Sequence, residues 1–334
     1  MTSRSRSLSV AVVQGGPSTE AEVSRASALG VAKALSEAGH SVVRLELDAF
    51  LAESLRTGGY DVVFPVVHGA VGEDGSLQGL LEVLDLPYVG SGVLASALAM
   101  HKRVARILFQ NAGLPIAPGL DVRRGDAAAA AQRVRREVGE RLVIKPSSHG
   151  SAIGVVRLEG GAPVSAVAAA LEAVWALDEF AVVEHFVRGR EVTCGVLEAD
   201  VAVALPPTEI FSPQDPFYTY EARYSPGRSH HVCPAALAPG VAARVQEVAV
   251  AAHRALGCRD LSRVDFIVGD DSAPDAVTLL EVNTLPGMTA TSLYPEAAAA
   301  RGMSMAALCE GFVVRAYTRG PARRHPARPM PGRN

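Results

Sequence analysis

Hard oxygen ligands are grouped near the C-terminus of this sequence. An apolar strand predicted at 277–280 runs directly into Glu281 and Asn283, and strand alternation places these two side chains on one face. A strand predicted at 264–268 contains Asp265, so a neighbouring strand would add a second carboxylate. Two carboxylates and an amide oxygen suit Mg²⁺ with its phosphates. We expect the Pro-Gly turn and the hydroxyl-rich run that follow to form a substrate loop.

Two of the three lysines lie where phosphate binding is expected. Lys33, Lys102 and Lys145 are the lysines among 32 basic residues. Lys145 ends a predicted strand and precedes the glycine- and serine-rich loop 146–154, whose backbone N–H groups could close over a polyphosphate. An ammonium group is a compact point charge, unlike the guanidinium fork, so keeping lysine at 102 and 145 fits phosphate chemistry. Chance survival of three lysines is the alternative.

Two polar loops follow the first predicted strands. Glu20 comes just after a glycine turn at the carboxyl end of the strand 8–13, where open α/β sheets bind their ligands. The loop 68–75 begins with His68, which we interpret as a substrate contact. The alternatives are a helix-start charge for Glu20 and a solvated turn for the second loop. The first glycine turn lacks dinucleotide or Walker-type spacing, so we do not expect it to bind a nucleotide.

An acidic pair flanks an apolar linker in the middle of the chain. Glu184 lies in a strand predicted at 180–187, and Glu191 follows the Arg-Gly-Arg turn after it. This arrangement fits a nucleotide whose adenine lies on the linker while Glu191 contacts the ribose. A solvated turn is the alternative for these charges.

Strands and helices predicted along the chain give an α/β fold class, with α+β character in the C-terminal half. Strands are expected at 8–13, 41–47, 61–67, 141–145, 155–158, 180–187, 192–198, 201–205, 264–268 and 277–280. Helices are expected at 21–38, 76–84, 95–110, 126–138, 239–256 and 295–317.

Two segments are expected to lack regular structure. The segment 206–234 is rich in Pro, Tyr and Ser, and a loop of this length in a compact domain is usually a lid or disordered. Its aromatic residues favour an ordered lid. The tail 318–334 contains five Arg and four Pro with little apolar content, so we expect it to be disordered.

Composition narrows the function classes. The chain has 334 residues, 49% hydrophobic and 20% charged, which is ordinary for a globular protein of about two or three domains. A formal charge of −3 gives no electrostatic case for nucleic acid or an anionic membrane. The apolar run near the N-terminus is too short for a signal peptide or membrane span, so we expect a cytoplasmic location. Four scattered cysteines without paired spacing predict reduced thiols.

In this order, the pieces make the chain resemble the D-alanine–D-alanine ligases of the ATP-grasp superfamily over about residues 8–316. Seven short stretches carry the resemblance: 15–24, 68–69 with 72–75, 90–92, 145–147 with 150–151, 220–222 with 224, 263–265, and 281–284 with 286–289. The family implies an ATP-grasp fold with a Rossmann-like N-terminal domain. The implied boundaries are 1–98 for the N-terminal domain, 99–186 for the central domain, 187–317 for the C-terminal domain with lid and metal site, and 318–334 for the tail.

The resemblance also implies the ligands. ATP would be gripped between the central and C-terminal domains, with two Mg²⁺ ions that Mn²⁺ can replace. The implied ATP-binding residues are Lys102, Lys145, Ser151, Glu184, His185, Val187, Glu191 and Arg223. The implied metal ligands are Asp265, Glu281 and Asn283.

The implied reaction makes D-alanyl-D-alanine for peptidoglycan precursors. One D-alanine carboxylate attacks the γ-phosphate to give an acyl phosphate, and the amine of a second D-alanine then displaces phosphate. Preorganised donors should dominate catalysis because charge develops on one oxygen of the tetrahedral intermediate. By analogy these donors are Arg263 and the backbone N–H of Gly287.

The family pattern assigns the remaining residues and a homodimer. Glu20 would receive the ammonium of the first substrate, and Tyr224 would favour dipeptide formation. The implied catalytic residues are Glu20, Ser151, Tyr224, Arg263, Gly287 and Ser292. The implied substrate-binding residues are Glu20, His68, Arg263, Gly287, Ser292 and Leu293.

Five positions depart from the family pattern: His101, His149, Ala152, Arg223 and Leu285. Arg223 stands where the lid usually has lysine, and the two are not interchangeable. No metal ligand or oxyanion donor is lost, so we expect activity. The alternatives are a paralogue with D-serine or D-lactate as second substrate, a secondary-metabolism or self-resistance ligase, and a nucleotide-binding regulatory protein without turnover.

Overall fold

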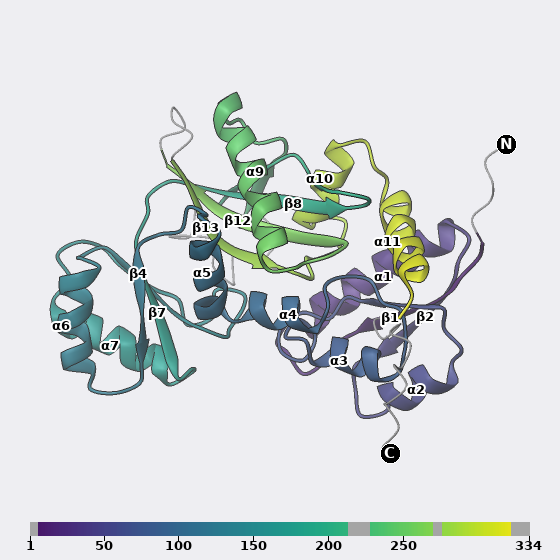
Figure 1. Cartoon of the computed structure of the whole chain (residues 1–334), viewed down its shortest axis with the longest axis horizontal. Coiled ribbons are helices and arrows are strands. Elements are labelled where there is room, and N and C mark those ends of the chain that lie inside the picture. The colour runs from purple at the N-terminus through teal and green to yellow at the C-terminus, as the bar shows by residue number, and fades with distance from the viewer. Residues whose placement is uncertain (1–5, 213–227, 270–275, 322–334) are drawn as a thin grey trace, which may run out of the picture.

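The computed structural model describes residues 6–212, 228–269 and 276–321 of the chain. Within these residues the strands form three sheets, which follow one another along the sequence. Figure 1 shows the sheet with α6 and α7 at one end of the molecule, the sheet with α9 in the middle, and the sheet with α1 at the other end. Most of the predicted site residues in the described part of the chain line two cavities between these sheets.

The N-terminal sheet is parallel, with strand order β2-β1-β3. Alternate residues of β1 contribute to two separate cores, Val10 and Val12 to one and Ala11 and Val13 to the other, because successive strand side chains point to opposite faces. Both faces are therefore covered by helices, as parallel sheets require. The elements are β1 (Ser9–Gln14), β2 (Ser41–Glu46), β3 (Val62–Pro65), α1 (Ala21–Glu37), α2 (Leu51–Thr57) and α3 (Ser76–Val83).

The single helix expected at 95–110 is wrong, because the chain forms α4 (Val93–Met100) and α5 (Lys102–Asn111). His101 separates them with φ −96° and ψ 87°, outside the helical region. Lys102 is thus the first residue of a helix, and its backbone N–H donates to the Ser147 carbonyl at 2.7 Å. The break places Lys102 directly against the glycine- and serine-rich loop.

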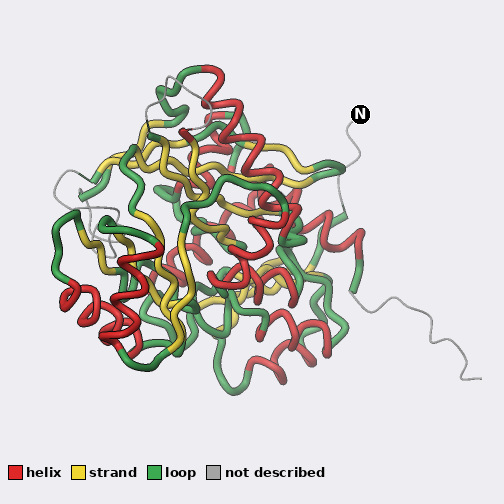
Figure 2. The backbone as a smooth tube through the Cα atoms, turned by 60° about the vertical axis from the view of Figure 1, so that its left-hand side comes forward, coloured by secondary structure: helices red, strands yellow, loops and turns green. Residues whose placement is uncertain are grey.

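The central sheet is antiparallel, with strand order β4-β7-β5-β6. Helices α6 and α7 cover its outer face, visible in both Figure 1 and Figure 2, and share a core with it that includes Trp175. Strand β4 and helix α7 were not predicted, and β7 ends at His185 rather than 187. The elements are β4 (Gly119–Arg123), α6 (Ala127–Glu137), β5 (Leu142–Pro146), β6 (Val156–Leu158), α7 (Val164–Trp175) and β7 (Phe180–His185).

The C-terminal sheet has six strands in the order β11-β10-β8-β12-β13, with β9 beside β8. Its core side packs against α9, α4 and α5. Two short strands, β10 and β11, lie in the segment expected to be irregular, while the predicted lid tyrosines lie outside the described residues. The elements are β8 (Arg190–Glu198), β9 (Ala202–Ala204), β10 (Thr208–Phe211), β11 (His230–Val232), α9 (Pro239–Ala255), β12 (Leu261–Val268) and β13 (Val277–Asn283).

The last part of the chain returns to the N-terminal sheet. The helix expected at 295–317 is two helices, α10 (Leu293–Ala300) and α11 (Met305–Arg319). Helix α11 packs beside α1, and the Phe312 and Phe64 rings lie 6.2 Å apart edge to face. The N-terminal and C-terminal sheets therefore share one hydrophobic core. Helix α11 also continues to Arg319, into the segment expected to be a disordered tail.

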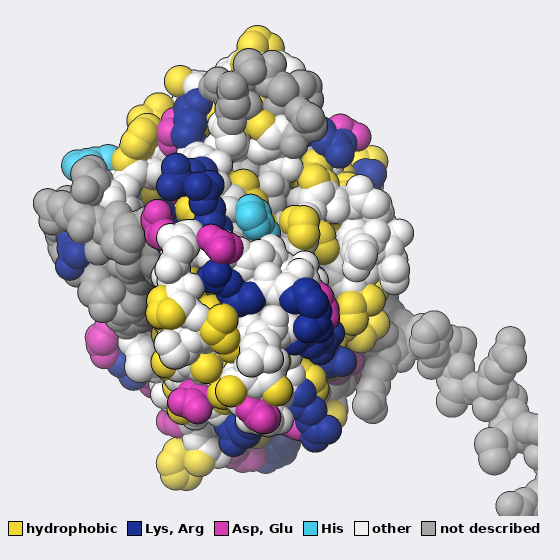
Figure 3. Space-filling view, turned by 90° about the vertical axis from the view of Figure 1, so that its left-hand side faces the viewer, with side chains coloured by type: hydrophobic (Ala, Val, Ile, Leu, Met, Phe, Trp, Pro, Cys, Tyr) yellow, Lys and Arg dark blue, Asp and Glu magenta, His cyan; other side chains and the backbone are white. Residues whose placement is uncertain are grey.

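Charged side chains and apolar helices are distributed as follows. Figure 3 shows basic and acidic side chains interspersed over the end of the molecule formed by the central domain. Within the described part of the chain no single helix is long and apolar enough to cross a membrane; the pair α10 and α11 reaches the length and composition together but is bent by 104°. The four cysteines are free, as predicted.

Candidate active site

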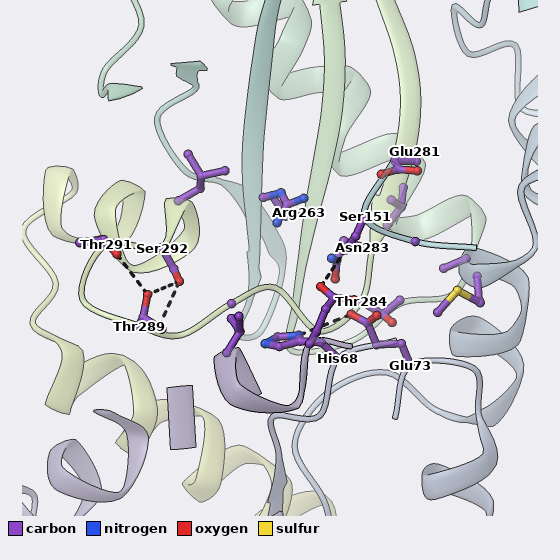
Figure 4. Close-up of a pocket in the computed structure, with 18 of the residues that line it drawn as sticks. His68, Glu73, Ser151, Arg263, Glu281, Asn283, Thr284, Thr289, Thr291 and Ser292 are labelled. Atoms are coloured by element: carbon purple, nitrogen blue, oxygen red, sulfur yellow. Dashed lines mark hydrogen bonds and ion pairs between the residues drawn. The ribbon is translucent and has the colours of Figure 1, made fainter. Parts of the chain in front are cut away.

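Strands β12 and β13 present four polar side chains on one sheet face. Arg263 lies opposite Asn283, and Asp265 lies opposite Glu281. Residues directly opposite in an antiparallel pair share a face, and so do residues two apart along a strand. Figure 4 shows Arg263, Glu281 and Asn283 beside these strands, with His68 and Glu73 below them in the view. The expected common face for Glu281 and Asn283 is therefore present.

Each predicted metal ligand already has a polar partner. Asp265 accepts two bonds from the Arg263 guanidinium, at 2.9 and 2.8 Å, and a third from the Thr193 hydroxyl at 2.6 Å. The Lys102 ammonium lies 3.2 Å from Glu281, and the Asn283 amide oxygen accepts from the Leu285 backbone. These partners hold the oxygen atoms in fixed orientations. A ligand that uses these oxygens must compete with these bonds.

A cavity of about 280 Å³ opens over this face of the sheet. Side chains from the segments that form all three sheets line it. The predicted residues that line it are Glu20, His68, Lys102, Ser151, Arg263, Glu281, Asn283, Gly287, Ser292 and Leu293. Asp265 lines neither this cavity nor the second one below, as far as the described residues go. The fold thus brings all the predicted substrate-binding residues together around one cavity.

A hydrogen bond closes one side of this cavity across two domains. Ser151 donates to Glu20 at 2.7 Å, and Glu20 is only 7% exposed. Ser151 and Ala152 have φ of 51° and 58°, the left-handed region that non-glycine residues rarely adopt. The glycine- and serine-rich loop is thus held in an uncommon conformation, with its serine reaching the first domain.

Buried charges surround His68. Its Nδ1 lies 3.8 Å from Glu73, whose other oxygen accepts from the Gly69 backbone at 2.7 Å. Burial acts to lower the pKa of His68, but the carboxylates of Glu73 and Glu20 outweigh it and raise the pKa above its ordinary value. The imidazole therefore carries positive charge over a wider pH range than a free histidine.

Hydroxyl groups line the end of the first cavity that lies away from His68 (Figure 4). The Ser292 hydroxyl lies 2.7 Å from the Thr289 hydroxyl and accepts from the Thr289 backbone at 3.0 Å (Figure 4). A Cβ atom on Gly287 would lie only 2.8 Å from the Ser292 oxygen, so glycine is required for this close approach. The loop after β13 thereby brings a backbone amide and hydroxyl donors to one place.

A second cavity, of about 160 Å³, lies between the central and C-terminal sheets. Its walls are largely apolar, and the predicted residues that line it are Lys102, Lys145, Glu184, His185, Val187, Glu191 and Glu281. Lys145 lies 2.6 Å from Glu184, which also pairs with Arg106. Lys102 and Glu281 line both cavities, so the two cavities adjoin at this ion pair.

Sequence reasoning did not assign four residues that contact predicted ones, and one more that lines the first cavity. The four are Glu73, Arg106, Thr193 and Thr289, and the fifth is His231. Arg106 follows Lys102 by one helical turn, a spacing that could have identified it. Glu73 and Thr289 lie within the short stretches 72–75 and 286–289 that carried the resemblance, so the sequence did mark their positions. Thr193 and His231 had no signal of their own, because only the packing of distant segments brings them to the site. Tyr224 and Arg223 lie outside the described residues. Among the departures, Ala152 and His149 line the second cavity.

Comparison with protein families gives two matches. The model described as "D-ala D-ala ligase C-terminus" matches residues 108–314, and the one described as "D-ala D-ala ligase N-terminus" matches residues 51–91. A D-alanine–D-alanine ligase of Pelotomaculum thermopropionicum is 41% identical over 311 residues, covering 92% of this chain and 96% of the relative. One of Acidiphilium cryptum is 45% identical over 312 residues, covering 93% and 99%.

Solved structures show the same likeness. The D-alanine–D-alanine ligase of Coxiella burnetii superposes with a TM-score of 0.77 at 28% identity, covering 93% of this chain and 96% of the other. The VanG D-Ala:D-Ser ligase of Enterococcus faecalis gives a TM-score of 0.79 at 29% identity, covering 93% and 100%. Both similarities extend over nearly the whole length of each chain.

Proposed function

This chain belongs to the D-alanine–D-alanine ligase family, and we propose that it joins two molecules of D-alanine, using ATP, to supply D-alanyl-D-alanine for peptidoglycan synthesis. The fold is the ATP-grasp fold of these ligases. The observation that carries the proposal is the meeting of two cavities at the Lys102–Glu281 pair, one polar and walled by three domains, the other largely apolar with two lysines.

The apolar cavity suits a nucleotide. Its apolar walls can cover a base, while Lys102 and Lys145 supply point charges for phosphates. Glu191 lines the same cavity, where it can accept from ribose hydroxyls. In this proposal His185 and Val187 form the linker beside the base, and Ser151 lies in the loop that closes over the phosphates.

The oxygen ligands on the β12–β13 face fit Mg²⁺. Within the described residues no cluster of three or more His, Cys, Asp or Glu has the spacing of a metal site. Asp265 and Glu281 are nevertheless opposed carboxylates, and Asn283 adds an amide oxygen, while phosphates and water would complete the shell as Mg²⁺ usually requires. Bound there, the metal would neutralise phosphate charge. Two ions, and Mn²⁺ as a substitute, are part of the proposal.

The polar cavity suits two amino acid substrates that react one after the other. Glu20 can hold the ammonium of the first D-alanine, beside Ser151 and His68. The first carboxylate oxygen attacks the γ-phosphorus, and ADP leaves. The amine of the second D-alanine attacks the acyl carbon, loses a proton, and inorganic phosphate leaves as its bond to that carbon breaks.

Charge on the tetrahedral intermediate needs donors that are already oriented. The Arg263 guanidinium is held by Asp265 at one end of the hydroxyl-lined loop, and the Gly287 backbone lies in the same cavity. Donors fixed in this way need no reorganisation when the oxyanion forms, so they contribute most in a site shielded from water. Tyr224, in the lid, belongs to the proposed site as well.

A substrate panel tests the proposal. The full chain with ATP and Mg²⁺ is offered D-alanine alone and D-alanine paired with D-serine, D-lactate or L-amino acids, with ADP release and product mass as readouts. D-Alanine alone should give ADP and D-alanyl-D-alanine in equal amounts. D-Serine is included because of the likeness to a D-Ala:D-Ser ligase. Product from another pair but none from D-alanine alone would overturn the proposal.

The remaining parts of the proposal are supported by family membership alone. They are the homodimer, the cytoplasmic location, and the division of the chain near residues 98, 186 and 317 into three domains and a tail. Helix α11, which belongs to the proposed C-terminal domain, packs on the N-terminal sheet.

A further inference from the structure

His231 and Glu296 face one another beside the hydroxyl-lined end of the polar cavity. The His231 Nδ1 lies 3.3 Å from a Glu296 carboxylate oxygen, a distance at which a protonated imidazole forms an ion pair. His231 lines the cavity together with Ser292 and Leu293, while Glu296 is not among its described lining residues. The imidazole thus separates a carboxylate from the space beside these two residues.

Independent packing contacts fix this arrangement. His231 lies opposite Ile210 in the β10–β11 ladder, and Ile210 packs on Leu293 at the start of α10. Strand alternation leaves His230 exposed on the other face of β11. The Glu296 backbone N–H donates to the Ser292 carbonyl at 3.1 Å, so Glu296 is one helical turn from Ser292. Three contacts therefore place the pair against the same end of the cavity.

The acceptor in an amino acid ligation carries a carboxylate, which a neighbouring carboxylate repels. The His231 Nε2 is buried without a hydrogen-bond partner among the described residues, so the ring has donor capacity that the rest of the described fold does not use. We propose that His231, positioned by Glu296, is a specificity-determining residue that screens Glu296 and favours binding of the acceptor carboxylate beside Ser292. This inference rests on the proposed ligase function.

Two measurements on the full chain separate acceptor from donor. Hydroxylamine replaces the acceptor amine by attacking the acyl phosphate, so D-alanyl hydroxamate formation reports the donor step alone. Dipeptide formation against D-alanine concentration then gives the acceptor KM. His231→Gln keeps a polar side chain of similar size but removes the imidazole that lies beside Glu296. We expect it to raise the acceptor KM about tenfold while the hydroxamate rate stays within about twofold.

Substituting Glu296, the partner of His231, should rescue the acceptor KM of the His231 variant. Glu296→Gln removes both the repelling charge and the partner that positions the imidazole, and these effects oppose each other, so the acceptor KM should stay within about twofold. In the double variant only the loss of repulsion counts, so Glu296→Gln should restore most of the affinity that His231→Gln loses. His230→Gln is the matched control, one residue away on the exposed face, and should change neither rate. Thermal unfolding of each variant checks that the fold is intact.

The inference is overturned if His231→Gln leaves the acceptor KM unchanged, raises the donor KM equally, or is not rescued by Glu296→Gln. Failure of the proposed function looks different: the unchanged chain would then form neither hydroxamate nor dipeptide from D-alanine. In that case the same four variants are compared with the substrate pair that the panel identifies, and the same pattern of acceptor KM values decides the inference.

Discussion

At the scale of single residues, Glu281 is the carboxylate that lines both cavities, together with Lys102. Its carboxylate lies 3.2 Å from the Lys102 ammonium, and the residue lies opposite Asp265 on the face of β12 and β13 that we propose binds the metal. A carboxylate in this place can bind a divalent cation, whereas a neutral amide of the same shape binds it far more weakly.

We predict that Glu281→Gln abolishes ADP formation while thermal unfolding remains cooperative. Mn²⁺ binding, followed by electron paramagnetic resonance, should weaken in parallel, which gives a readout independent of turnover. Glu172→Gln, exposed on α7, is the matched control and should change neither. An unaffected ADP rate in the Glu281 variant would break the metal assignment.

His68 should make stability depend on pH. Its pKa is raised in the folded protein above the ordinary 6.5 because of Glu73 and Glu20, despite burial. A group with a raised folded-state pKa stabilises fully below its unfolded pKa, and the contribution is lost as pH rises through the folded pKa. Urea unfolding should therefore show His68→Gln to be more destabilising near about pH 6 than near about pH 9.

The control for this pH effect is His230→Gln, because His230 is exposed. Comparing the two variants at both pH values separates the effect of the buried histidine from the loss of a histidine in general. A His68 variant that loses the same free energy of unfolding at both pH values would show that Glu73 and Glu20 do not hold a charged imidazole.

At the scale of elements, the loop after β13 depends on one glycine. A methyl group at Gly287 would lie 2.8 Å from the Ser292 hydroxyl, which accepts from Thr289. We predict that Gly287→Ala displaces this hydroxyl and raises the acceptor KM about tenfold, because an error of about 1 Å in position can cost up to a hundredfold in rate.

Gly79→Ala provides the matched comparison for the loop. Gly79 lies inside α3, where an added methyl meets Val93 only at an ordinary 4.0 Å. This variant should keep both KM values and gain slightly in stability, since alanine is the better helix former by about 1 kcal/mol. Equal kinetic loss in both variants would argue against a local effect at Ser292.

At the scale of the whole molecule, Asp260 joins the first and last parts of the chain. Its side chain is 3% exposed, accepts from the Gly90 backbone at 2.8 Å, and receives two bonds from Arg319 of α11. These contacts tie the segment after the N-terminal sheet and the end of α11 to the start of β12 in the C-terminal sheet.

We predict that Asp260→Asn lowers the free energy of unfolding by about 3 kcal/mol, because Arg319 and the Gly90 N–H lose a buried carboxylate. Asparagine tolerates the left-handed φ of 62° at this position, so the variant isolates the charge. Urea unfolding measures the loss. Glu137→Gln, which breaks exposed pairs with Arg133 and Arg136, should leave the free energy of unfolding almost unchanged.

Local patterns in the sequence determined much of this protein. Strand alternation placed Glu281 and Asn283 on one face, and the glycine turn after the first strand marked where Glu20 lies. These features depend on residues a few positions apart, and the same is true of the short motifs that revealed the family. The short strands β10 and β11 and the break at His101 were missed. Each involves only one to four residues, and so short a segment shows almost no periodic pattern of apolar residues.

Tertiary structure alone decided which distant residues meet. Ser151 reaches Glu20 across 131 positions, α11 returns to cover the first sheet, and His231 is set against Glu296 by the packing of Ile210 on Leu293. The physical reason is that periodicity reports which face of an element is buried, whereas contacts between faces depend on how whole sheets and helices pack. The sequence thus determined the chemical groups of the site, and the packing of the three sheets determined their partners.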